Sequence, residues 1–131
     1  MTMRILGTLL LLGALATTAG AQGSQFHLAS AQVVTGDGPP MLRLAASGPV
    51  AHAVEPEPDG SATPADRLRL RLYGVTATAA LAAEVVAPYT LQATGDGRDT
   101  ILVVTAPGLA PGTRLAVGTA ARASELVIVV R

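Results

Sequence analysis

The sequence predicts an all-β fold: a small β-sandwich of two symmetric sheets built from a duplicated three-strand motif. Short apolar segments with a two-residue period recur between turn residues through most of the chain. The tetrapeptide Thr-Gly-Asp-Gly occurs at 35–38 and again at 94–97, and a short apolar strand follows each copy. One three-strand unit cannot bury its own apolar face, so we expect the two units to pack face to face.

The first 21 residues have the order of features found in a secretory signal. Arg4 is the only charge before the stretch from Ile5 to Ala16, which is apolar apart from two glycines and one threonine. Ala19-Gly20-Ala21 then supplies a small-residue cleavage site. We therefore predict a signal-peptide helix over 1–21 and a periplasmic or secreted protein. An uncleaved anchor is the alternative, although the stretch is shorter than the roughly 20 residues that span a bilayer.

Composition limits what the remaining residues, 22–131, can be. They are short enough for one domain, which we place at 26–131, and no later segment is apolar for long enough to cross a membrane. The chain contains no cysteine, so disulfides and cysteine chemistry are excluded. It also contains no lysine and carries a formal net charge of zero, which argues against nucleic acid as a partner.

The first half is expected to contain four strands. We place them at 26–34, 41–45, 50–54 and 67–75. The last has the strongest alternation, with leucines at 68, 70 and 72 against arginines at 67, 69 and 71. In the first strand, Phe26, Leu28 and Val34 are expected to share a face. The segment 55–66 is acidic and rich in proline, which indicates a solvated loop or an insertion.

The second half repeats this pattern after a linker. The alanine-rich segment 76–83 is expected to form a helical turn or short helix. Strands are then expected in four places, at 84–93, 100–105, 113–117 and 126–130. The strand 100–105 is apolar at successive positions, which favours burial on both faces or a central position in the sheet. In the repeat alignment, Ile101 and Val103 correspond to Leu42 and Leu44.

Two stretches of the sequence resemble the AMIN domain family. The first runs from Arg43 through Ser47-Gly48-Pro49-Val50, and the second contains Asp66-Arg67-Leu68 before the alternating leucines and Gly74-Val75. The second half resembles the family too, from Thr100 through a proline-glycine corner to the strand at 125–129. The resemblance covers about 26–131. It departs from the family pattern at Arg71, where an acidic residue is common, and in the acidic loop.

This resemblance implies a fold of two symmetric sheets and a non-enzymatic exported module that binds peptidoglycan. In relatives the module is joined to an amidase domain or to the pore-forming part of a pilus secretin. The alternative is a protein-interaction subunit of an envelope assembly, such as a type IV pilus or secretin machine. The expected partner is thus peptidoglycan or an envelope protein, and the oligomeric state is left open.

Four arginines form the candidate ligand-binding site. Arg67, Arg69 and Arg71 are spaced roughly 7 Å apart along one strand face, and Arg43 is expected on the neighbouring strand. Guanidinium groups pair well with carboxylates, which peptidoglycan stem peptides carry. The alternatives are a solvated face that protects the sheet, and internal neutralisation of the arginines by the acidic loop.

Other polar residues give weaker indications of chemistry. Asp37 and Asp96 each lie between glycines, which favours turns over calcium sites because each turn supplies one carboxylate. His27 and His52 lie on different predicted strands and lack an evident third ligand for zinc. Ser47 has no surrounding nucleophile elbow. We therefore predict no catalytic residue, no metal site and no cofactor.

Overall fold

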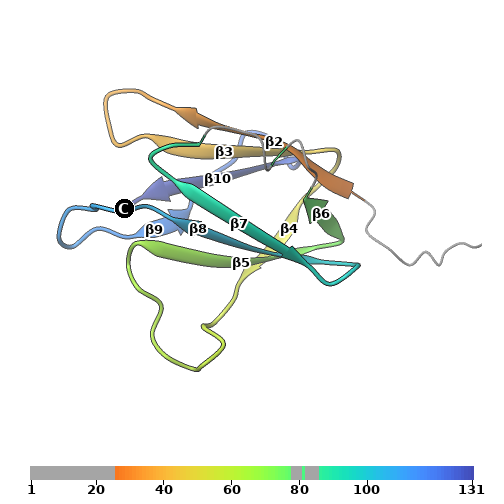
Figure 1. The fold of residues 1–131 in the computed structure, drawn as a ribbon. Helices are drawn as coiled ribbons and strands as arrows, with labels where there is room; N and C mark the ends of the chain where they lie inside the picture. Colours follow the sequence, from red (N-terminus) through yellow and green to blue (C-terminus); the bar gives the residue numbers. More distant parts are fainter. Residues whose placement is uncertain (1–25, 78–80, 82–85) are drawn as a thin grey trace, which may run out of the picture.

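The computed structural model of the protein describes residues 26–77, 81 and 86–131, and this part of the chain is all-β (Figure 1). The predicted signal-peptide helix over 1–21 lies outside the described residues. The strands of the first half are β2 (Phe26–Val34), β3 (Met41–Ala46), β4 (Ala51–Val54), β5 (Arg67–Tyr73) and β6 (Val75–Ala77). Those of the second half are β7 (Thr90–Gly95), β8 (Thr100–Thr105), β9 (Leu115–Val117) and β10 (Glu125–Val130). Within the described residues, no helix combines the length and apolar character needed to cross a membrane.

The strands form two sheets that draw on both halves of the chain. One sheet has the order β6-β2-β3-β10-β9 and the other the order β4-β5-β8-β7. The hairpin β2–β3 pairs with β10 of the second half, and the hairpin β7–β8 pairs with β5 of the first. In the second half β10 also pairs with the short strand β9 that precedes it, and in the first half β5 pairs in the same way with β4. Each half therefore depends on the other to complete its sheets.

One apolar core fills the space between the sheets. Leu68, Leu70 and Leu72 of β5 point into it, as their alternation predicts. Residues from both sheets that are wholly buried include Leu28, Leu42, Leu44, Leu70, Leu72, Leu102, Val104 and Ile128. Burying a leucine or isoleucine side chain contributes about 1.5–3 kcal/mol, so this shared core is the main stabilising feature of the fold.

A bulge in β2 changes which of its residues face the core. The pairing of β2 with β3 shifts register between Leu28 and Ser30, which inserts one extra residue into β2. Beyond the bulge, Ala31 is buried and Val33 packs against the core. The expectation that Val34 shares the face of Phe26 and Leu28 is therefore wrong, because an uninterrupted two-residue period does not pass through a bulge.

The predicted strand 67–75 is two strands in two sheets. Gly74 has φ +67°, a left-handed conformation that glycine adopts without strain, and the chain there leaves β5 and enters β6. Val75 thus pairs in parallel with Phe26 in the other sheet. The buried Thr100 hydroxyl donates a hydrogen bond of 2.6 Å to the Val75 carbonyl, which ties the two sheets together at this crossover.

The inward face of β8 differs from the one that the repeat alignment predicts. Thr100, Leu102 and Val104 are buried, whereas Ile101 and Val103 lie on the other face and are half-buried. Burial on both faces is therefore not found, whereas the alternative, a central position, is confirmed, because β8 lies between β5 and β7. The pairing also makes Leu102 and Val104 the counterparts of Leu42 and Leu44. The two turns differ in length, covering 35–40 and 96–99, because two prolines extend the first.

The linker between the halves follows β6. Thr76 and Ala77, expected in a helical turn, belong to β6, and the rest of 76–83 except Leu81 lies outside the described residues. Leu81 is buried in the core. Tyr89 is also buried just before β7, and its hydroxyl donates a hydrogen bond to the carbonyl of Pro40. The linker therefore contributes apolar side chains to the same core as the sheets.

Candidate functional site

The candidate site is the outer face of the four-stranded sheet. Arg67, Arg69 and Arg71 alternate with the buried leucines of β5, so they project together from this outer face, as predicted. Their cross-strand neighbours on β8 are Thr105, Val103 and Ile101, respectively. The next strand, β7, places Thr90, Gln92 and Thr94 opposite the same β8 residues. The face is thus a row of arginines beside a central strip of half-buried aliphatic groups and a polar edge.

Arg43 does not belong to this face. It lies on β3 between the buried residues Leu42 and Leu44, in the five-stranded sheet, so it points to the opposite outer surface of the molecule. The strands next to β5 are β4 and β8, so the expectation that Arg43 neighbours the arginine row is wrong. The exchange of strands between halves separates residues that a simple meander would have brought together.

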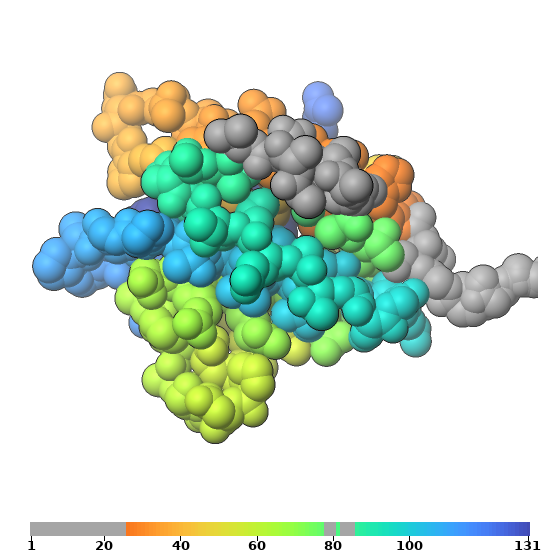
Figure 2. All heavy atoms as spheres, viewed as in Figure 1, coloured from red at the N-terminus to blue at the C-terminus, as the bar shows by residue number. Residues whose placement is uncertain are grey.

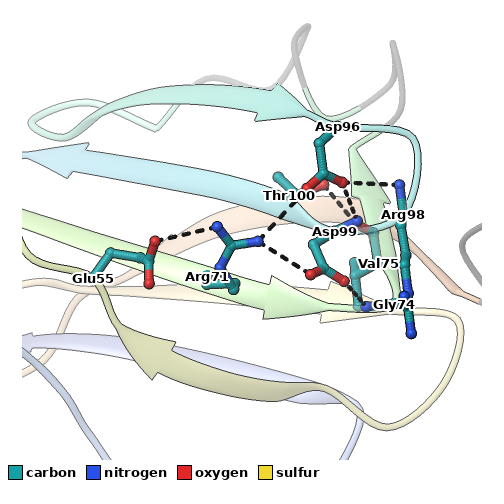
Figure 3. Close-up of polar contacts among 8 residues, drawn as sticks. All are labelled: Glu55, Arg71, Gly74, Val75, Asp96, Arg98, Asp99 and Thr100. Carbon is teal, nitrogen blue, oxygen red and sulfur yellow. Dashed lines mark hydrogen bonds and ion pairs between the residues drawn. The ribbon is translucent and has the colours of Figure 1, made fainter. Parts of the chain in front are cut away.

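Arg71 is bound by carboxylates from two different segments (Figure 3). One nitrogen of its guanidinium lies 3.3 Å from Glu55 Oε1, at the end of β4. The other lies 3.1 Å from Asp99 Oδ2 and 3.6 Å from Asp96 Oδ2, in the β7–β8 turn. The hydrogen bonds with Asp99 and Glu55 raise the pKa of Arg71 above its ordinary value. Arg71 therefore holds three strands of the sheet together and is already paired.

Asp99 and Asp96 organise the turn that reaches Arg71. Asp99 Oδ1 accepts a hydrogen bond of 2.8 Å from the Gly74 amide, so this carboxylate also fixes the crossover between the sheets. Asp96 Oδ1 accepts hydrogen bonds from the amides of Asp99 and Arg98, and these bonds lower the pKa of Asp96. The turn role predicted for Asp96 is thus present, whereas Asp99 was missed because its partners are distant in sequence.

Arg67 is paired with the loop between β4 and β5, which projects from the body of the molecule (Figure 2). Its guanidinium lies 2.7 Å from Oε1 of Glu57, whose side chain is only 8% exposed. The other oxygen of Glu57, Oε2, is buried without a hydrogen-bond partner among the described residues. Asp59 instead accepts hydrogen bonds from the hydroxyl and amide of Ser61, which lower the pKa of Asp59. Internal neutralisation by the acidic loop is therefore real for Arg67 and Arg71.

Arg69 is the unpaired member of the row. It is half-buried between Arg67 and Arg71, and no ion pair within the described part of the chain involves its guanidinium. Its backbone carbonyl accepts a hydrogen bond from the Glu55 amide, so its place in the sheet is fixed. Of the three arginines on this face, Arg69 is the one able to bind an external anion without giving up an internal partner.

The Ser47-Gly48 corner has a structural explanation. The amide of His27 donates a hydrogen bond of 3.0 Å to the Ser47 hydroxyl, and the Ser47 amide donates to the His27 carbonyl. A Cβ atom on Gly48 would lie only 2.2 Å from the ring of Phe26, so the ring needs glycine at this position. The corner thus anchors the start of β2.

Neither histidine belongs to a metal cluster within the described residues. His27 lies on β2 and His52 on β4, in different sheets. No group of three or more histidine, aspartate or glutamate side chains among the described residues is arranged to hold a metal ion.

Comparison with known proteins does not assign this chain to a family. No family model matches it, and neither a curated protein nor a solved structure matches it. The outer face of the four-stranded sheet therefore stands as a candidate site on its geometry: a sheet face on which one of the three β5 guanidinium groups has no ion pair within the described residues.

Proposed function

We propose that the protein is an exported, non-enzymatic AMIN-like module of the cell envelope that binds peptidoglycan. The signal-like N-terminal segment supports export, and the sequence motifs support the family resemblance. In this proposal the identical order of pairing in the two sheets, β2-β3-β10-β9 and β7-β8-β5-β4, reflects a duplicated motif of the AMIN kind. The observation that carries the proposed binding role is the unpaired Arg69 on an exposed sheet face.

The chemistry of this face suits a carboxylate-bearing polymer. A guanidinium donates two parallel hydrogen bonds to one carboxylate, and peptidoglycan stem peptides carry free carboxylates. The polar side chains of Gln92 and Thr94 on β7 can donate to and accept from sugar hydroxyls. Tyr73 is 47% exposed at the end of β5. An arginine orients an anion but supplies neither a nucleophile nor a general base at neutral pH, so the face is suited to binding rather than to catalysis.

Co-sedimentation with isolated cell-wall sacculi tests this function. The purified protein should sediment with sacculi at low salt and should be released as the salt concentration rises, because exposed charges are screened. Arg69→Gln should reduce the bound fraction several-fold. Arg122→Gln is the matched control, because it removes the same charge from an exposed loop outside this face. Failure to sediment at low salt, or an equal loss in both variants, would contradict the proposal.

A further inference from the structure

The strand β4 has a free backbone edge. It is the terminal strand of its sheet, and the amide of Glu55, just after it, donates to the Arg69 carbonyl of β5. Hydrogen-bonded pairs alternate along an antiparallel ladder, so Ala51 and Ala53 also direct their amides and carbonyls toward β5. His52 and Val54 direct theirs away from the sheet, and no other described segment pairs with them.

This edge lacks the side chains that normally prevent another strand from pairing. Edge strands are commonly protected by charged side chains or proline, and β4 contains neither, since its sequence is Ala-His-Ala-Val. Val54 is 65% exposed. By contrast, the edge of β9 is partly occupied, because the Leu115 amide donates to the Ala65 carbonyl. The four residues of β4 therefore form an accessible site for strand addition.

A cleft of about 380 Å³ adjoins this edge, between the two sheets. His52 and Val54 line one side of it, and β9 lines the other. His52 and Val54 pair with Leu72 and Leu70, whose side chains face the core, so the inner side of β4 faces the cleft. A strand added to β4 would direct every second side chain toward this cleft.

The charged residues that line the cleft are all arginines. They are Arg67, Arg69 and Arg114, and no acidic residue lines it. Arg67 is paired with Glu57, and the side chains of Arg67 and Arg69 project from the outer face of β5. No ion pair within the described residues involves Arg114, which precedes β9 on the other side of the cleft. Arg114 is exposed, and only its backbone is bound, through hydrogen bonds with Arg131. The cleft therefore favours side chains with negative charge.

We propose that β4 and the adjoining cleft bind an extended acidic segment of a protein partner, which adds to the sheet as a fifth strand. The partner's backbone pairs with His52 and Val54, and its acidic side chains, placed at alternate positions on the side of the cleft, meet Arg114. This site lies apart from the proposed wall-binding function and does not depend on it. A second copy of this chain fits less well, because pairing β4 with β4 would bring the arginines of two clefts together.

A synthetic ten-residue peptide of alternating valine and glutamate, with a fluorescent label, provides the probe. Its binding to the full-length protein is measured by fluorescence anisotropy at low and high salt. The same peptide with glutamine in place of glutamate is the charge control. We expect the glutamate peptide to bind at least about tenfold more tightly than the glutamine peptide at low salt, and the difference to shrink as salt rises.

Two pairs of variants locate the site. Val54→Pro removes the outward amide but keeps the bonds to β5, and it should weaken binding about tenfold, whereas Val54→Ala keeps the amide and should have little effect. Arg114→Gln should weaken binding several-fold, and Arg122→Gln should not. Circular dichroism and the unfolding midpoint of each variant show whether it remains folded.

Three outcomes would overturn this proposal. They are equal binding of the two peptides, an unchanged affinity in folded Val54→Pro, and a self-association of the protein that Val54→Pro abolishes. The last would identify a second copy as the occupant. Arg114 lies outside the arginine row of β5. The Arg114→Gln variant therefore tests peptide binding independently of sacculus binding, which Arg69→Gln tests.

Discussion

The strands β5 and β10 hold corresponding positions in the two sheets, but their outward-facing side chains differ in character. Each pairs with a strand of the other half on one side and with a short edge strand on the other. Their inward residues are interchangeable in character: Leu68 and Leu70 in β5, and Leu126 and Ile128 in β10. Outward, β5 carries arginines, whereas β10 carries Val127 and Val129.

What covers each outer face accounts for the difference. Val127 is only 7% exposed although it points away from the core, and the chain just after β9 lies against β10 there, since the Gly118 amide donates to the Val127 carbonyl. The arginines of β5 are approached instead by the acidic loop and by the β7–β8 turn, which supply carboxylates. The shared core thus requires apolar inward residues in both strands. The outward residue types differ because different loops lie against the two outer faces.

The largest effect is expected from substitutions in the core, which test whether β5 and β10 contribute equally to stability. Leu70→Ala and Ile128→Ala each remove a wholly buried side chain from the centre of one sheet, and each should lower the free energy of unfolding by about 2–5 kcal/mol. Urea denaturation of the two variants measures this loss. If one of them proved nearly neutral, the two strands would not carry the core equally.

Removing Asp99 tests whether the turn beside β5 is a structural contact. Asp99→Ala loses the bonds to Arg71 and to the Gly74 amide and should lower the free energy of unfolding by about 1–3 kcal/mol, because the amide at the crossover is left unpaired. Asp37→Ala is the control from the corresponding turn of the first half, where Asp37 is exposed and makes no such contacts. Equal losses, measured by chemical denaturation, would show that Asp99 has no special role.

The cover over β10 is tested at Gly118. A Cβ atom there would lie 2.9 Å from Cγ1 of Val129, so Gly118→Ala should cost about 1–2 kcal/mol in thermal or urea unfolding. In the double variant that combines Gly118→Ala with Val129→Ala, the shorter side chain at 129 should make room for the added methyl group and recover part of the lost stability. Such non-additivity is expected of residues in contact. Gly36→Ala is the control, since no atom lies within 4 Å of the added group. A purely additive double variant would contradict the proposed contact.

The smallest effect concerns pH and the β7–β8 turn. The amides of Asp99 and Arg98 hold the pKa of Asp96 below 3.8, its ordinary value. The ionised carboxylate therefore stabilises the native state above the unfolded pKa, and this contribution is lost as the pH falls through the lower native pKa. Asp96→Asn should accordingly reduce the difference in unfolding free energy between pH 6 and pH 3. A variant with the pH dependence of the wild type would show that the turn does not depend on this charge.

Much of the local structure was predictable because it depends on neighbours along the chain. The alternation of leucine and arginine in β5, the all-β character and the turn at Asp96 follow from residue period and turn chemistry. The bulge in β2 and the chain crossing at Gly74 were missed, since a bulge leaves no clear period and a glycine in a strand has several meanings. The candidate site was half predicted: the row of β5 was right in placement, and Arg43 was not.

The sequence by itself determined the all-β class and the shared face of the three β5 arginines, because strand periodicity fixes side-chain direction within one segment. Only the tertiary structure decided which arginine remains unpaired. Glu55, Glu57 and Asp99 reach Arg67 and Arg71 from 10 to 28 residues away, and Arg69 is left without such a partner. Ion pairs between distant segments depend on how the two halves exchange strands between the sheets, and local sequence patterns do not indicate that exchange.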